Sequence, residues 1–418
     1  MTAPAVTSLS FETPLRVRRR ELDLWQLAAV TGLMLLGALF VWSATHAGDA
    51  AAGLAWFEYR WVRQCVWYAL GAAAAVAVCV VDYRTLARWS YVVWWAAMLL
   101  LVLVLVPGIG TSHGWGALRW IDLGPIQFQP SEFAKLAFIV AAANYLSRPA
   151  EELRRARVFW TGIGLMALPF VLILKEPDLG SALVLVPTGL AMMLVAGAPR
   201  KYLLRLMGGA GAAAALLLVD VLFAPPGWRI QLEDYQRDRL LVYFGRDFTS
   251  LAPPNATAAE LERLRERQRD RSYNVRQASI AVGSGGLTGK GLGRGTQKAL
   301  GFLPPSVAHN DFIFSVLAEE TGFVGSVSVL ALYAVVLFTG LRTAGQARDR
   351  LGKLLAVGVV SLLFSQVFIN IGMNIRLMPV TGVPLPLLSY GGSSVLGSLI
   401  AIGILQNLHL RRKGYGYE

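Results

Sequence analysis

The chain has 418 residues, of which 55% are hydrophobic and only 16% are charged, whereas about 25% of residues are charged in an ordinary soluble protein. This composition excludes a soluble globular protein and predicts an integral membrane protein, because a membrane-spanning helix needs ~20 mostly apolar residues. The net charge of +13 could suggest nucleic-acid binding, but the aromatic residues lie inside apolar runs and the basic residues lie between them. We therefore attribute the charge to membrane topology.

Ten apolar runs follow one another along the chain and predict ten transmembrane helices. They lie at about 22–44, 62–81, 89–106, 132–147, 158–174, 179–197, 203–223, 312–340, 354–374 and 394–408. Basic residues are concentrated in the tails 1–21 and 409–418 and in every second short loop, so both termini are predicted to be cytoplasmic. The predicted fold class is an all-α polytopic membrane protein, with a membrane domain over 22–408 that includes a large external loop over 224–311.

The external loop carries two local signals. Thr257 and Glu260 have the spacing of a capping box, which predicts a short surface helix over 261–271. The glycine-rich stretch 283–295 suggests a phosphate loop, but it lacks the Gly and the Ser or Thr that a Walker loop needs on either side of Gly-Lys. We interpret this stretch as a tight turn close to neighbouring backbone; contact with a phosphorylated ligand is the alternative.

Ionisable residues gather on the predicted external side, and such residues in or beside transmembrane helices usually mark a cavity or a pathway. The candidates for substrate binding are Arg119, Trp120, Glu132, Lys135, Lys175, Glu176, Asp178, His309 and Arg376. Glu132 and Lys135 lie three residues apart on a predicted helix, so an intrahelical ion pair is the alternative for them. The segment 376–394 is too apolar for an exposed loop and too rich in Pro and Gly for a helix. We expect it to be a re-entrant segment that dips back into the protein.

Asp311 stands at the start of the eighth apolar run, where it could cap the helix or act as a functional acid. Glu319 lies near the same helical face and ~12 Å deeper, and capping does not explain this second acid. His309 has no second His or Cys at ligand spacing, so we expect it to orient a neighbour or contact a ligand rather than bind a metal. This mixture of acids and cations suits an anionic amphiphile whose head group needs acid–base chemistry.

Seven motifs in order along nearly the whole chain resemble those of the SEDS family, the family of RodA and FtsW. They are Arg63-Gln-x-x-Trp67, Gly116-Ala-Leu-Arg119-Trp120-Ile, Gln129-Pro-Ser-Glu132-Phe-Ala-Lys135, Glu176-Pro-Asp178-Leu-Gly180-Ser, Gly283-Ser-Gly-Gly-Leu-x-Gly-Lys-Gly, His309-Asn-Asp311-Phe-Ile-Phe and Leu388-Ser-Tyr-Gly-Gly-Ser-Ser394. The stretch from Met378 to Pro386 resembles RodA more than FtsW.

The resemblance implies a ten-span peptidoglycan glycosyltransferase of the cytoplasmic (inner) membrane that polymerises lipid II on the outer face during cell elongation and shape maintenance. It also implies three kinds of partner: lipid II, a class B penicillin-binding transpeptidase and membrane proteins of the elongation complex. Asp311 is implied to be the essential acid, because it matches the Asp of the family's His-Thr-Asp-Phe motif. Here Asn310 replaces that Thr, and the approach from Leu303 to His309 is longer and lacks the family's Glu.

The resulting hypothesis makes Asp311 a general base that takes the proton of the acceptor sugar's 4-hydroxyl while undecaprenyl pyrophosphate leaves the donor with inversion. Arg119, Lys135, Lys175 or Arg376 could balance the charge of the leaving group. A divalent cation such as Mg²⁺ or Mn²⁺ could share this task, although no metal motif requires one.

Three alternatives remain: a lipid II flippase or transporter, a scaffold for a penicillin-binding partner, and a division enzyme of the FtsW type. Transport would spread ionisable residues through both halves of the membrane. Most of the informative residues lie on the predicted outer side, which favours chemistry at one face.

Overall fold

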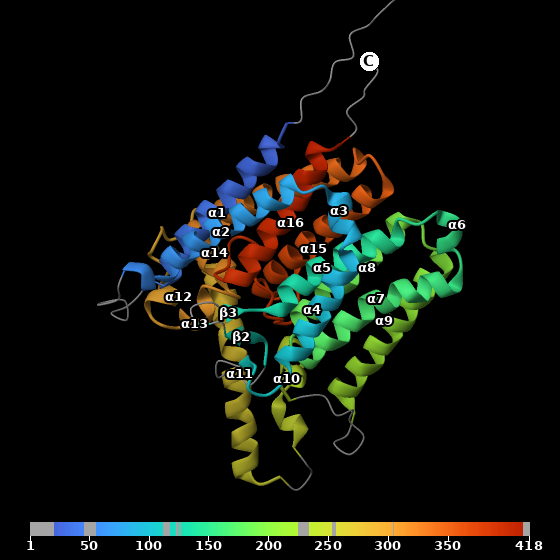
Figure 1. The fold of residues 1–418 in the computed structure, drawn as a ribbon. Coiled ribbons are helices and arrows are strands. Elements are labelled where there is room, and N and C mark those ends of the chain that lie inside the picture. Colours follow the sequence, from blue (N-terminus) through green and yellow to red (C-terminus); the bar gives the residue numbers. More distant parts are fainter. Residues whose placement is uncertain are drawn as a thin grey trace, which may run out of the picture.

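The computed structural model describes residues 21–45, 56–111, 118–122, 124, 127–224, 234–252, 256–303 and 305–412. Within these residues, ten long helices match the ten predicted spans (Figure 1): α1 (Leu24–Thr45), α2 (Arg60–Val80), α4 (Ser90–Val104), α5 (Pro130–Leu146), α7 (Ala156–Lys175), α8 (Leu179–Ala196), α9 (Arg200–Phe223), α14 (Ile313–Gly345), α15 (Arg350–Asn374) and α16 (Gly392–Leu410). Eight are long and apolar enough to cross a membrane; α4 and α5 have 15 and 17 residues. The prediction of an all-helical polytopic membrane protein is confirmed.

Shorter elements connect these helices. The helical ones are η2 (Trp56–Glu58), α3 (Tyr83–Arg88), α6 (Ala150–Leu153), α10 (Asp234–Tyr243), η3 (Phe248–Leu251), α11 (Ala258–Ser284), α12 (Thr296–Ala299) and α13 (Pro305–Ala308). Three short strands, β1 (Gly110–Thr111), β2 (Trp120–Asp122) and β3 (Gln127–Phe128), form an antiparallel sheet in the order β1-β2-β3. The all-α prediction missed this small sheet, which precedes α5 and holds Trp120 against Thr111.

The bundle is organised around α15 and α16, which are mostly buried by other helices, whereas α9 is almost entirely exposed at the edge (Figure 1). Asp23, just before α1, forms an ion pair of 2.6 Å with Arg342 of α14. Its backbone N–H donates to the side-chain oxygen of Gln406 on α16 at 3.0 Å. The beginning of α1 and the end of α16 therefore lie at one end of the bundle. Helices α10 and α11 project from the opposite end (Figure 1).

Helix α11 begins at the predicted capping box. The Thr257 hydroxyl accepts from the Glu260 N–H at 3.3 Å, and the Glu260 carboxylate accepts from the Thr257 N–H at 2.7 Å. The predicted length was wrong, because the helix continues to Ser284. Ala278 and Ala281 are buried in its second half, so packing against α14 extends a helix that charge patterning alone predicted to be short.

The glycine-rich stretch after α11 packs its backbone against α14. The N–H groups of Lys290 and Gly291 donate to the carbonyls of Glu319 and Glu320 at 3.0 and 2.9 Å. Gly289 has a φ of +78° and a Cβ there would collide with the Glu320 carbonyl, so only glycine fits this approach. The interpretation as a tight turn against neighbouring backbone is confirmed.

The segment 376–394 has irregular backbone up to Gly391, where α16 follows, and most of its residues from Met378 onward are buried or half-buried among the helices. Its carbonyls are satisfied by side chains of the bundle: the Tyr68 hydroxyl donates to Leu387 O at 2.6 Å, and the Asn370 amide donates to Val383 O at 2.7 Å. Irregular backbone at membrane depth needs such protein partners because lipid offers none. The segment thereby forms one wall of the cavity described below.

Candidate active site

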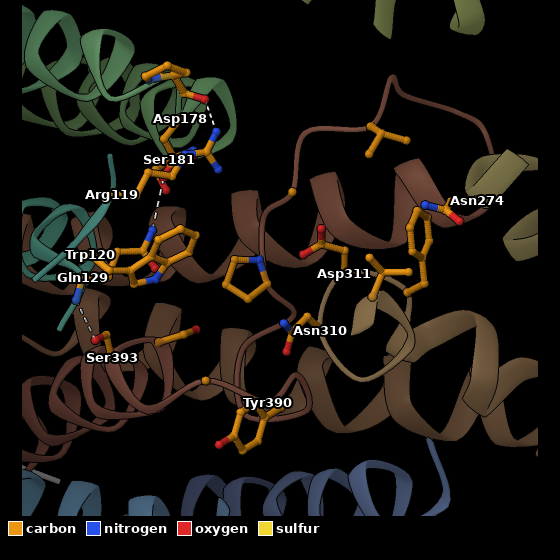
Figure 2. A pocket seen from close by; sticks show the side chains of 18 of the residues that line it. Arg119, Trp120, Gln129, Asp178, Ser181, Asn274, Asn310, Asp311, Tyr390 and Ser393 are labelled. Atoms are coloured by element: carbon orange, nitrogen blue, oxygen red, sulfur yellow. Dashed lines mark hydrogen bonds between the residues drawn. The ribbon is translucent and has the colours of Figure 1, made fainter. Parts of the chain in front are cut away.

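A cavity of about 1540 Å³ opens where α10, α11, the start of α8, the β2–β3 sheet and the segment 376–394 meet. It is lined by the predicted site residues Arg119, Trp120, Asp178, Asp311 and Arg376. In Figure 2, Asp311 lies across an open space from Arg119, Trp120 and Asp178. The fold thus brings together residues from four regions that are far apart in the sequence.

Asp311 lies in the turn between α13 and α14. The N-cap of α14 is Phe312, and no side-chain hydrogen bond caps this helix, so the capping interpretation of Asp311 is wrong. The main chain is held instead, because the Asp311 carbonyl accepts from the amides of Asn370 and Asn374, each at 3.1 Å. This anchoring by α15 leaves the carboxyl group on the cavity wall.

Three neighbouring charges act on the Asp311 carboxyl in addition to burial. Burial raises its pKa above the ordinary value, Arg239 and Arg119 lower it in that order, and Asp178 raises it; the net direction is upward. A raised pKa makes a carboxylate a stronger base at neutral pH. Arg239, on α10, was missed in the sequence because it belongs to a charged stretch, 234–246, with three arginines, and the sequence does not show which of them faces the cavity.

Arg119 is fixed by backbone carbonyls at the end of α7. Its Nε donates to Glu176 O at 3.1 Å and its Nη2 donates to Pro177 O (Figure 2). Asp178 caps α8 by accepting from the Ser181 N–H at 3.1 Å and also accepts from the Gln129 amide at 3.3 Å. Both side chains are therefore held rigidly where they border the cavity.

Glu176 does not line the cavity. Its side chain is fully buried, and within the described part of the chain neither carboxyl oxygen has a hydrogen-bond partner. Burial, reinforced by Asp178 and opposed by Arg119, raises its pKa to about 9. Glu176 is therefore neutral at pH 7. It contributes to the site through its backbone carbonyl, which accepts a hydrogen bond from Arg119, rather than through a carboxylate.

Replacing Glu176 with Gln should stabilise the protein increasingly as pH rises. The folded pKa of about 9 lies above the ordinary glutamate pKa of 4.5, so folding favours the protonated acid and wild-type stability falls as pH rises between these values. Gln does not titrate, so the difference in Tm between the variant and the wild type should grow from about pH 5 to about pH 9. Thermal melts in detergent measure this difference; the exposed control Glu262→Gln should show none, and a constant difference for Glu176→Gln would contradict the assignment.

Glu132 and Lys135 are the main departure from the predicted substrate-binding set. They form an ion pair of 2.7 Å within α5 and are 3% and 1% exposed. The pair faces α16, where a Cβ at Gly397 would lie 3.9 Å from Glu132 Oε2, and neither residue lines the cavity. The intrahelical ion pair, which was the alternative, is the arrangement that the structure shows.

Three other residues that the sequence singled out also lie outside the cavity lining. Lys175 is exposed at the end of α7 and lies outside the cavity lining. His309 is buried, its carbonyl accepts from the Tyr390 N–H at 2.9 Å, and its ring meets the Tyr390 ring edge-on at 5.4 Å. It therefore orients Tyr390, which lines the cavity. Glu319 binds Lys290 at 2.6 Å and so belongs to the glycine-rich turn rather than to a deeper part of the site.

Among the described residues, no group of three or more His, Cys, Asp or Glu side chains is arranged to hold a metal ion. The participation of Mg²⁺ or Mn²⁺ stays a prediction.

Comparison with known proteins places this geometry in a family. The model of the FtsW/RodA/SpoVE family, described as cell cycle protein, matches residues 24–414. Peptidoglycan glycosyltransferase MrdB of Escherichia coli K12 is 34% identical over 395 residues, which cover 94% of this chain and 95% of the relative. The probable peptidoglycan glycosyltransferase FtsW of Geobacter metallireducens is 34% identical over 411 residues, 97% of this chain and 99% of that protein. Stage V sporulation protein E of Bacillus subtilis is 35% identical over 384 residues, 90% and 93% of the two chains.

Solved structures support the same family assignment. One, described as the structural coordination of polymerization and crosslinking by a peptidoglycan synthase complex, has a TM-score of 0.70 and 29% identity and covers 93% of this chain and 97% of that chain. The rod shape determining protein RodA of Thermus thermophilus has a TM-score of 0.61 and 29% identity, covering 94% and 97%. The resemblance to the SEDS family is confirmed, and the chain belongs to the FtsW/RodA/SpoVE family of multi-pass membrane proteins.

Proposed function

We propose that this protein is a peptidoglycan glycosyltransferase that polymerises lipid II on the outer face of the cytoplasmic membrane. The observation that carries the proposal is Asp311, a partly buried carboxyl group that does not cap its helix and lies on the wall of a large cavity that Arg119 and Arg239 also line. Such a group is suited to general-base catalysis. The names of MrdB and FtsW, which are similar over nearly their whole lengths, support this activity.

In the proposed reaction, the 4-hydroxyl oxygen of the acceptor sugar attacks the anomeric carbon of the lipid-linked donor. The new glycosidic bond forms as the bond from that carbon to the diphosphate breaks, with inversion, and the leaving undecaprenyl diphosphate keeps the electron pair. The proton of the acceptor hydroxyl moves to a carboxylate oxygen of Asp311. Arg119 faces the same cavity and balances the charge that develops on the diphosphate.

We further propose a role in cell elongation together with a class B penicillin-binding transpeptidase. The stretch from Met378 to Pro386, which resembles RodA, supports elongation rather than division. Identities of 34% to both MrdB and FtsW do not separate the two roles. The similarity to a synthase complex that couples polymerisation and crosslinking supports a crosslinking partner.

Polymerisation of labelled lipid II by the purified full-length chain tests the proposal. The assay is run with and without a transpeptidase partner, and the products are separated by gel electrophoresis. We expect glycan ladders. In parallel, the chain is reconstituted into vesicles and the movement of lipid II between leaflets is measured. Movement of lipid II between leaflets, with no glycan ladders either with or without the transpeptidase partner, would overturn the proposal in favour of a flippase. The absence of both polymerisation and movement would favour a scaffold.

A further inference from the structure

The segment 376–394 contacts both Arg239 and Asp311. Its Nη1 donates to the Thr381 carbonyl at 3.3 Å. The next residue, Gly382, packs against Asp311, since a Cβ at this glycine would lie 3.7 Å from Asp311 Oδ2. Arg239, Gly382 and Asp311 all line the cavity. One short stretch of backbone, residues 381–382, thus contacts both the guanidinium group and the acid in the same cavity.

Arg119 borders the same space from the opposite direction. It is fixed by the carbonyls of Glu176 and Pro177, and Figure 2 shows it across the open space from Asp311. Burial lowers the pKa of Arg239, and the charge of Arg119 lowers it further. Two guanidinium groups that repel each other across a cavity form a site for an anion with two charged oxygen groups.

The balance of charge fits an anion that gains charge during the reaction. In the resting site, the positive charges of Arg119 and Arg239 are balanced by the negative charges of Asp178 and Asp311. These two acids raise the pKa of Arg239, whereas Arg119 lowers it. When Asp311 accepts a proton, one positive charge loses its partner. The site then becomes most attractive to an anion at the moment when the diphosphate leaves, which is the condition for stabilising a transition state rather than a ground state.

We propose that Arg239 and Arg119 form a two-arginine site for the diphosphate group of the polyprenyl-linked sugar donor. The inference rests on the proposed function and names the groups that recognise the leaving part of its substrate. Guanidinium groups bind phosphate oxygens in pairs with a fixed geometry. A diphosphate can engage both arginines, whereas a monophosphate engages one.

Asp238 is the positioning residue for Arg239. It is 1% exposed and accepts from Arg267 Nε at 3.0 Å and from Arg271 Nε at 3.3 Å, both on α11. Asp238 also lines the cavity. Consecutive residues of a helix point about 100° apart, so Asp238 can bind α11 at the cavity edge while Arg239 points into the cavity in a different direction. The bridges from α11 fix the rotation of α10 about its axis and with it the direction of the Arg239 side chain.

Binding of farnesyl diphosphate and farnesyl monophosphate to the purified full-length chain in detergent, measured by calorimetry, tests this site. We expect the wild type to prefer the diphosphate by roughly tenfold or more, the effect of one additional charge-assisted contact. Arg239→Gln should remove this preference, and Arg239→Lys should restore only part of it. Asp238→Asn should reduce the ratio of the two affinities without weakening monophosphate binding. Arg265→Gln, which removes an exposed arginine of α11 outside the cavity, should leave the ratio unchanged.

An equal affinity of the wild type for both ligands would overturn the proposal, as would an unchanged ratio in folded Arg239→Gln. If Arg239→Gln has a much lower Tm than the wild type, the test uses the affinity ratios of the wild type and of Arg239→Lys instead. A ratio in the Lys variant equal to that of the wild type would then contradict the site. The measurement does not depend on glycosyl transfer. A chain that prefers the diphosphate but makes no glycan would therefore contradict the proposed function and leave this site standing.

Discussion

Replacing Asp311 with Asn should lower the rate of lipid II polymerisation by roughly 10²- to 10⁴-fold, because the amide cannot accept the proton of the attacking hydroxyl. The fold should survive, since Asn370 and Asn374 hold residue 311 through its carbonyl oxygen, which the substitution retains. Initial rates of glycan formation and thermal melts of the same preparations measure the two expectations.

The matched control is Glu262→Gln, which removes an exposed carboxylate of α11 that lies outside the cavity. It should polymerise and melt like the wild type. Equal rates for Asp311→Asn and the wild type would remove Asp311 from catalysis. A large loss of stability with an unchanged rate per folded molecule would assign it a purely structural role.

The pH dependence of the rate should report the surroundings of Asp311. Only the deprotonated carboxylate is a base, so the rate falls as pH decreases through its pKa. Burial raises that pKa, and Arg239 lowers it more than Arg119 does. Arg239→Gln should therefore move the acidic limb of the pH–rate profile to higher pH. A limb that stays in place in this variant would show that another group titrates.

Replacing Glu132 with Gln should destabilise the protein by about 3–5 kcal/mol, because Lys135 would remain charged and buried without its partner. The pair is 2.7 Å apart, and both side chains are almost completely buried. The double variant Glu132→Gln with Lys135→Met removes both charges and should recover much of the loss. Unfolding of the purified protein by SDS titration or heating measures the free energies.

The same variants separate a structural pair from a substrate contact. If Glu132 and Lys135 only stabilise α5 against α16, the folded double variant should polymerise lipid II at nearly the wild-type rate. A folded but inactive double variant would return both residues to the substrate-binding set. Equal destabilisation in the single and double variants would contradict the coupling of the two charges.

Apolar runs determined most of the architecture. A helix in a membrane satisfies its own backbone hydrogen bonds, so about 20 apolar residues define an element without reference to its neighbours. Local chemistry also determined the start of α11 at Thr257, because a capping box closes within one turn. Asp311 could be singled out in the same way, as an ionisable residue at the boundary between a polar segment and an apolar helix.

Only the tertiary structure decided which charged residues face one another. The sequence showed that Glu132, Lys135 and Glu176 needed special surroundings, but the rotation of α5 and the packing of α7 placed them away from the cavity. Arg239 gave no signal of its own, because its place beside Asp311 depends on how α10 docks on α11 and on the segment 376–394. A residue's type determines what partner it requires, whereas the partner that it obtains is set by packing between segments far apart in the chain.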